Sequence, residues 1–379
     1  LLKAQQEAKQ LDAKKATAKE NVDDLTNKVG ETNRELTALK ESGAKKRSTL
    51  ENELKIAGPE FLTKVITHEI ERNEIPESES KTPALSSNSF VGSDGKTYYV
   101  AANEDVDFNG EKTEIIEVKS KEDYEKPHVI DYKKVSEEVR NYLVELRKIN
   151  GIDIPVPEVT DKALKYAKAR SDEMLAKDEL SHATKLKKED FGLVGSTENA
   201  SAGSLPYEDI ISEKEIAYKE VLGYFNDYTN ASSYGSSSPT EANPMNYGHR
   251  IPLLSASGTG MAVGSSSNEK SQYGTLQFVT DDPDVQVYPT AEGSYSSVYF
   301  LAKAENKDSD MSHSEFYYNG KRVKFLPKTT FVYVWKETTH PKNPEFEKAK
   351  NALDTFNDAQ KKSEAVLTTK LDGYNKQLD

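Results

Sequence analysis

Cysteine is absent from the 379-residue chain. This absence excludes disulfide scaffolds, thiolate zinc sites and cysteine nucleophiles. It does not separate a cytosolic protein from an extracellular one, because proteins of both compartments can lack cysteine.

Apolar residues are scarce, and the 64 acidic residues outnumber the 51 basic ones. Hydrophobic residues make up 35% of the chain and charged residues 30%, and the mean hydropathy is -0.77. This is too little apolar material for one compact globule of this length, so we expect a surface-rich, elongated chain with a smaller core. The net charge of -13 argues against nucleic acid as a partner and disfavours docking on an anionic membrane.

Long apolar runs are also missing. No run approaches the roughly 18 to 20 residues of a membrane span, and no signal peptide is visible. The chain begins Leu1-Leu2 and ends inside a helical pattern. We interpret it as a fragment whose targeting and anchoring segments lie outside this sequence.

Residues 1–57 contain apolar and small residues at alternating steps of four and three. This spacing predicts a long helix with a coiled-coil seam, although Gly43 and Lys46 fall on the seam and are expected to weaken it. Gly58-Pro59 is a signal for the helix end. The seam consists of Leu1, Ala4, Ala8, Leu11, Lys15, Ala18, Val22, Leu25, Val29, Thr32, Leu36 and Leu39.

A second helix is predicted over residues 341–379, where seam residues recur from Phe346 to Leu378. One helix leaving and one returning, with a globular insert between them, predicts an antiparallel coiled-coil stalk. The alternative is a parallel homodimer through residues 1–57. We favour the antiparallel pair, because each helix needs a partner and the chain supplies one.

Between the two helices we expect a linker and a head. Residues 58–133 form the linker, with small β elements around Tyr98–Val100 and Ile115–Val118 that fit a hairpin. Residues 134–340 form the head. Three helices are predicted first, the third over about 208–228, and antiparallel strands follow. This order predicts the α+β class. The strands are expected at 260–264, 273–280, 297–303, 316–318 and 329–335.

Two histidines and two glutamates of the head stand in polar, Gly- and Ser-rich surroundings. They occur in the order His182, Glu198, Glu220 and His249, in a chain with only six His. Taken alone, each is explained more simply as a helix cap, a solvated helix position or a loop residue. Their order and spacing make them a candidate site.

The motifs that carry these four residues resemble those of the CAP superfamily (cysteine-rich secretory proteins, antigen 5, pathogenesis-related 1). The resemblance covers roughly residues 135–280. The chain departs from the family pattern at Thr197, which replaces a glycine, and it lacks the family's tryptophan near the second glutamate. The motifs are Leu180-Ser181-His182, Glu198-Asn199-Ala200-Ser201-Ala202-Gly203, Tyr218-Lys219-Glu220-Val221, Gly248-His249-Arg250 and Gly260-Met261-Ala262-Val263-Gly264.

The resemblance implies an α-β-α sandwich whose cleft collects His182, Glu198, Glu220 and His249 as catalytic residues. Such a set suits a divalent metal, Zn²⁺ or Ca²⁺, with His182 and His249 as ligands. It also suits general-base catalysis, in which a glutamate raises the pKa of a neighbouring histidine. No zincin motif and no serine-hydrolase elbow occurs, so hydrolysis would use water or an unrecognised serine.

A CAP-like head between two long helices is similar to the PrgA-type surface-exclusion proteins of Gram-positive conjugative plasmids. That resemblance implies an extracellular, cell-wall-anchored protein. Its head would act as a protease on the surface adhesin of the same plasmid system and limit redundant plasmid uptake. The alternative is a non-enzymatic binding or spacer protein, whose cleft is vestigial or binds an ion or lipid. A cytosolic coiled-coil scaffold would leave the Ser/Gly- and Tyr-rich head unexplained.

Overall fold

The computed structural model describes most of the chain, and the chain divides into two compact units. One unit joins Leu1–Thr67 to Lys336–Asp379, and the other is His68–Trp335. Parts of the predicted linker 58–133 and of the predicted head 134–340, including part of the strand expected at 297–303, lie outside the described residues. The described ranges are 1–72, 89–99, 106–203, 210–227, 248–288, 298–301, 315–318 and 321–379.

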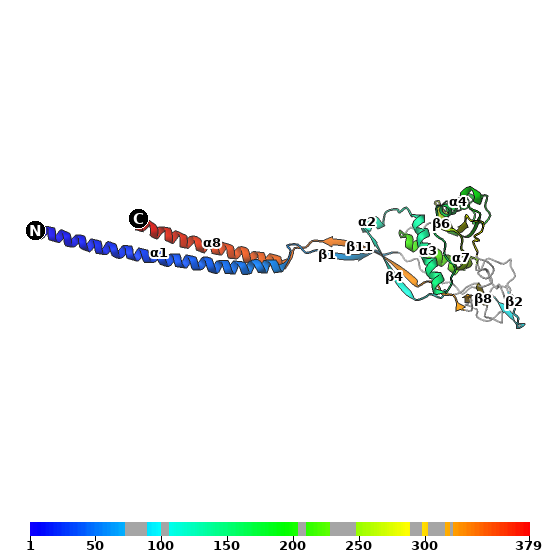
Figure 1. The fold of residues 1–379 in the computed structure, drawn as a ribbon, viewed down its shortest axis with the longest axis horizontal. Coiled ribbons are helices and arrows are strands. Elements are labelled where there is room, and N and C mark those ends of the chain that lie inside the picture. Colours follow the sequence, from blue (N-terminus) through cyan, green and yellow to red (C-terminus); the bar gives the residue numbers. More distant parts are fainter. Residues whose placement is uncertain are drawn as a thin grey trace. The chain divides into compact units, whose positions relative to one another are not determined.

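The described residues form helices and strands in mixed order (Figure 1). The helices are α1 (Leu2–Ala57), α2 (Lys121–Tyr124), α3 (Tyr132–Ile149), α4 (Asp161–Lys177), the 3-10 helix η1 (Lys188–Phe191), α5 (Glu213–Asn226), α7 (Arg250–Ser255) and α8 (Pro344–Leu378). The strands are β1 (Lys64–Glu69), β2 (Ser89–Val91), β3 (Thr97–Tyr99), β4 (Glu111–Val118), β5 (Gly195–Gly203), β6 (Gly260–Ser267), β7 (Gln272–Thr280), β8 (Val298–Leu301), β9 (Glu315–Tyr318), β10 (Lys321–Arg322) and β11 (Lys328–Thr339).

The predicted α+β class is confirmed at this level. The CAP-type sandwich and the coiled-coil stalk stay predictions.

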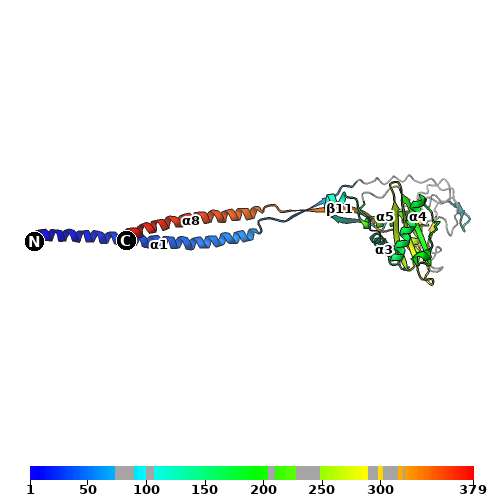
Figure 2. The same cartoon turned by 90° about the horizontal axis from the view of Figure 1, so that it is seen from above.

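In the first unit, α1 and α8 lie side by side and run in opposite directions (Figures 1 and 2). Asn343 joins their adjacent ends. Its Oδ1 accepts the backbone N–H of Glu345 at 3.1 Å, and its Nδ2 donates to Ala57 O at 2.8 Å. The same amide therefore caps the start of α8 and satisfies a carbonyl at the end of α1. Gly58 follows with φ 84°, a conformation that favours glycine.

The side chains of α1 that are withdrawn from solvent follow the predicted seam from Leu25 to Leu54. Gly43, which was expected to weaken the seam, is itself buried. A Cβ at Gly43 would lie 2.4 Å from Nε2 of Gln360 on α8. Glycine thus leaves the space that this buried amide occupies, and Gln360 Nε2 donates to Leu39 O at 3.0 Å.

In the second unit, the strands β5, β7 and β6 form an antiparallel sheet in that order. Alternate residues of β6 face opposite sides of this sheet. Met261 and Val263 belong to the core shared with α3 and α5, whereas Ala262 packs with Ala163 and Ala167 of α4. Helices therefore cover both faces of the sheet. At Gly264 a Cβ would meet the Ala167 backbone at 2.3 Å, so glycine permits the close approach of α4.

The remaining strands differ from the expected hairpin. β4, which contains Ile115–Val118, pairs in parallel with β11, and β1 lies on the other side of β11. β3, which contains Tyr98 and Tyr99, pairs instead with β2. The predicted third helix is also shorter than expected: α5 begins at Glu213, after its cap residue Ser212, and ends at Asn226.

Candidate active site

The candidate site is built on β5, the strand that carries Glu198. Among the described strands, β5 pairs with β7 alone, so it lies at an edge of its sheet. Because neighbouring residues of a strand face opposite sides, Glu198 points to the α4 side while Asn199 points to the α5 side. The structure places a different histidine with each of these two residues.

On the α4 side, His182 Nδ1 lies 3.0 Å from Glu198 Oε1. The His182 side chain is 60% exposed, whereas that of Glu198 is only 12% exposed. An accessible imidazole thus rests on a buried carboxylate. The hydrogen bond to Glu198 raises the pKa of His182 above its ordinary value, more than burial lowers it.

Glu198 is held from two further sides. Arg170 of α4 donates from Nε to Oε2 at 3.0 Å and from Nη2 to Oε1 at 2.8 Å. Gln277, opposite Glu198 on β7, donates to Oε2. Burial alone would raise the pKa of Glu198, but the hydrogen bonds from His182, Arg170 and Gln277 lower it to about 2. Glu198 is therefore ionised at neutral pH and can only accept hydrogen bonds.

On the α5 side, His249 pairs with Asp227, a residue that the sequence did not single out. Asp227 Oδ1 lies 2.8 Å from His249 Nδ1, and Asp227 Oδ2 accepts the backbone N–H of His249 at 3.0 Å. Asn199 donates to His249 O at 2.8 Å, and the Tyr224 ring packs edge-on at 5.3 Å. Asp227 ends α5 in a left-handed conformation and has a fully buried side chain.

Glu220 lies on α5, one turn before Tyr224. Its carboxyl is partly buried, and within the described ranges it makes no hydrogen bond or ion pair. Burial raises the pKa of Glu220 to about 7. Burial and then the charge of Glu220 raise the pKa of Tyr224. Tyr224 in turn donates to Ser201 Oγ at 3.3 Å.

The four predicted residues thus fall into three settings. His182 and Glu198 are hydrogen-bonded to each other, His249 is bonded to Asp227, and Glu220 lies near Tyr224. In the part of the chain that the structure describes, no hydrogen bond or ion pair joins the His182–Glu198 pair to the His249–Asp227 pair. β5 connects the two pairs through the adjacent residues Glu198 and Asn199.

A metal at His182 and His249 stays a prediction. Each histidine uses Nδ1 for a carboxylate, so each has only Nε2 to offer an ion. Among the described residues, no group of three or more His, Cys, Asp or Glu side chains is placed to hold a metal ion. Two nitrogens fall short of the three protein ligands of a catalytic zinc site, and we assign no chemical step to a metal.

Arg170 and Asp227 were not recognised from the sequence. Arg170 lies in the run Lys168-Ala169-Arg170, which is typical of a solvated helix face, yet its side chain is only 1% exposed. Asp227 directly follows α5, where a polar residue commonly ends a helix. Neither position carries a local signal for the histidine or carboxylate that it meets in the fold.

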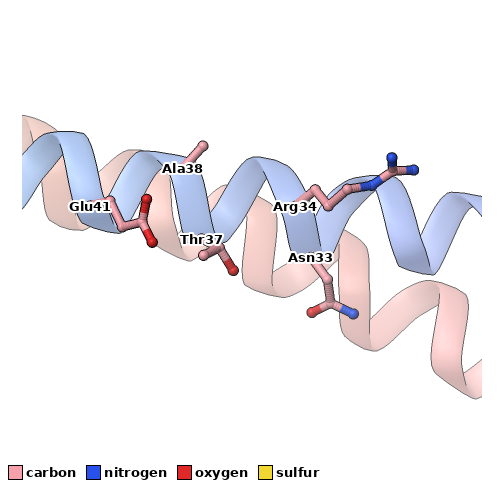
Figure 3. Close-up of a pocket in the computed structure, with 5 residues that line it drawn as sticks. All are labelled: Asn33, Arg34, Thr37, Ala38 and Glu41. Atoms are coloured by element: carbon pink, nitrogen blue, oxygen red, sulfur yellow. The ribbon is translucent and has the colours of Figure 1, made fainter.

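A surface depression of about 330 Å³ lies on α1, in the other compact unit (Figure 3). All five residues that line it are exposed, and none is a histidine or a nucleophile placed beside a base. The depression therefore offers no catalytic chemistry. Its lining residues are Asn33, Arg34, Thr37, Ala38 and Glu41.

Comparison with known proteins adds no relative: no protein-family model matches the chain, and no curated protein matches its sequence. Within the described residues, no helix has the length and apolar character needed to cross a membrane. The fold and the site together define an α+β protein with an exposed histidine supported by a buried, ionised glutamate.

Proposed function

We propose that the unit His68–Trp335 is a hydrolytic head in which His182 acts as a general base and Glu198 orients it. The substrate class that we propose is a protein at a bacterial cell surface. In the setting implied by the sequence resemblance, this substrate is the surface adhesin of a conjugative plasmid, and the chain is a surface-exclusion protein with a CAP-like head on a coiled-coil stalk. The observation that carries the proposal is the exposed imidazole on a buried carboxylate.

The chemistry follows from the ionisation of Glu198. Because Glu198 only accepts, neutral His182 carries its proton on Nδ1, and the lone pair of Nε2 is available to a water molecule. His182 takes a proton from this water as the oxygen attacks the carbonyl carbon of a peptide. The C–N bond then breaks, and the proton on Nε2 passes to the leaving amine. No hydroxyl of the described residues is hydrogen-bonded to His182, so water is the nucleophile in this scheme.

The test is cleavage of the purified adhesin by the full chain and by His182→Ala. We expect the variant to lose at least about 100-fold in rate, which is the scale of general-base catalysis, with a nearly unchanged thermal midpoint, because the ring is exposed and Arg170 and Gln277 still bind Glu198. In the unmodified protein the rate should fall as the pH drops through the pKa of His182, because the protonated imidazole cannot act as a base. The matched control is His128→Ala, since His128 is also exposed and, among the described residues, its ring is hydrogen-bonded only to Tyr124 O at 3.3 Å.

Equal cleavage by both variants would contradict a role for His182.

A second function, a non-enzymatic spacer or binding head, is favoured by one observation: α1 and α8, of 56 and 35 residues, form a compact unit of their own. This second function predicts that cells carrying His182→Ala still limit uptake of the plasmid. It also predicts that they lose this effect when matched heptads are removed from α1 and α8.

A further inference from the structure

The His182 loop has no regular secondary structure, yet it is tied to α4 on both sides of the histidine. Ser181 O accepts a hydrogen bond from Arg170 Nη2 at 2.9 Å. After His182, Thr184 Oγ1 donates to Glu173 Oε2 at 2.6 Å, and Lys185 N donates to Glu173 Oε1 at 2.8 Å. Arg170 and Glu173 therefore fix the loop immediately before and after the exposed ring.

Arg170 and Glu173 are also bonded to each other. Arg170 Nη1 lies 2.5 Å from Glu173 Oε2, and the Arg170 side chain is 1% exposed. The same guanidinium grips Glu198 with two parallel hydrogen bonds. One planar group thus connects the carboxylate that orients His182 with the backbone that carries it, which a lysine cannot reproduce.

We propose that Arg170 is the positioning residue of this site: it orients Glu198 and anchors the loop that presents His182. The inference rests on the proposed function only for its effect on activity, since the geometry of the loop can be measured without a substrate.

The alternative is that Arg170 only neutralises buried charge and stabilises the fold. A merely structural role predicts lower stability in Arg170 variants, but unchanged amide hydrogen exchange of the His182 loop in the folded protein. The two roles are separated by measuring this exchange directly.

The experiment uses the full chain and measures amide hydrogen exchange at residues 181–185 together with the rate of cleavage. In Arg170→Gln we expect faster exchange at Ala183 and Lys185, because the bonds of Arg170 to Ser181 O and Glu173 are lost. In Arg170→Lys the charge remains, but the two parallel bonds to Glu198 are lost. Its loop should also exchange faster, while kcat falls and KM changes little.

Two further variants keep the test decisive. Thr184→Val removes one anchor without changing a charge, and should speed amide hydrogen exchange of Lys185 even if Arg170→Gln does not fold. Arg140→Gln is the control, because Arg140 on α3 binds Pro157 O and Glu158 and should leave both readouts unchanged. A folded Arg170→Gln protein with unaltered exchange in the His182 loop, or unaltered exchange in Thr184→Val, would overturn the inference. Faster loop exchange in Arg170→Gln, in a protein that cleaves no substrate, would contradict the proposed function and leave the positioning role supported.

Discussion

Glu198 and Glu220 are two carboxylates of one unit whose pKa values move in opposite directions. Both are withdrawn from water, which by itself raises the pKa of a carboxyl. Glu198 receives hydrogen bonds from Arg170, His182 and Gln277, and its pKa falls to about 2. Glu220 has burial alone, and its pKa rises to about 7. Glu198 is thus a fixed negative charge, whereas Glu220 gains or loses its proton near neutral pH.

Replacing Glu220 by Gln should stabilise the protein in a pH-dependent way. The folded-state pKa of Glu220 lies above its unfolded value, so between about pH 4.5 and 7 the native state binds more protons than the unfolded state. Stability from this group is therefore lost as the pH rises through that window. Glu220→Gln abolishes this loss, and we expect a gain of about 1 to 3 kcal/mol at pH 8 and little change at pH 4.

Urea unfolding of both proteins at pH 4, 6 and 8 measures this difference. The control is Glu145→Gln, because Glu145 is exposed on α3. A constant difference between Glu220→Gln and the unmodified protein at all three pH values would mean that Glu220 does not titrate in this window.

At the same scale, the sequence allowed His182, Glu198, Glu220 and His249 to be proposed as one set, but it did not indicate that His182 and Glu198 would be bonded to each other, nor which residues would support them. Motif order identified the set, because the motifs are short and contiguous. Arg170 meets Glu198 across 28 positions of sequence, and Asp227 meets His249 across 22. Each contact depends on how α4 or α5 packs against β5, and no local pattern encodes that packing.

Among the elements, β5 shows where local propensity fails. Its sequence, Gly195-Ser-Thr-Glu-Asn-Ala-Ser-Ala-Gly203, has a single β-branched residue, and strand propensity alone argues against it. The strand forms because β7 pairs with it along its whole length. From Leu25 to Leu54 the side chains of α1 that are withdrawn from solvent fall on the predicted repeat of seven, which is a local signal, whereas the predicted seam residues from Leu1 to Val22 are exposed. The partner of Gly43 was not predictable, because Gln360 lies 317 positions away.

Gly43 and Gln360 should be energetically coupled. In Gly43→Val, the added side chain enters the space of the Gln360 amide and displaces it from Leu39 O. We expect the α1–α8 pair to lose about 1 to 3 kcal/mol, as for other overpacked sites. Combining the change with Gln360→Ala should restore part of this loss, and thermal unfolding followed by circular dichroism at 222 nm measures both.

The control is Gly30→Val, because nothing lies within 4 Å of a Cβ at Gly30. It reports the helix-propensity difference without the clash. If the effects of Gly43→Val and Gln360→Ala simply add, the two positions do not share the space that the structure assigns to them.

On the scale of the whole molecule, two units with separate sources of stability share one chain. The first depends on the seam between α1 and α8, and the second on the core between α3, α5 and the sheet of β5, β7 and β6. The strands β1 and β11 pass from one unit to the other, with the divisions at Thr67/His68 and Trp335/Lys336. The inserted unit can stay folded after the flanking helices unfold, provided that each unit buries enough surface by itself.

We therefore expect the chain to unfold in two steps. A single two-helix seam buries little apolar surface, so α1 and α8 should melt first and give a large loss of helical signal. Trp335 is the only tryptophan and stacks on His68 at 4.4 Å within the second unit, so its fluorescence reports the later step. Gly43→Val should lower only the first midpoint, and Glu220→Gln at pH 8 should raise only the second. Coincident transitions that both variants shift together would show that the two units fold as one cooperative body.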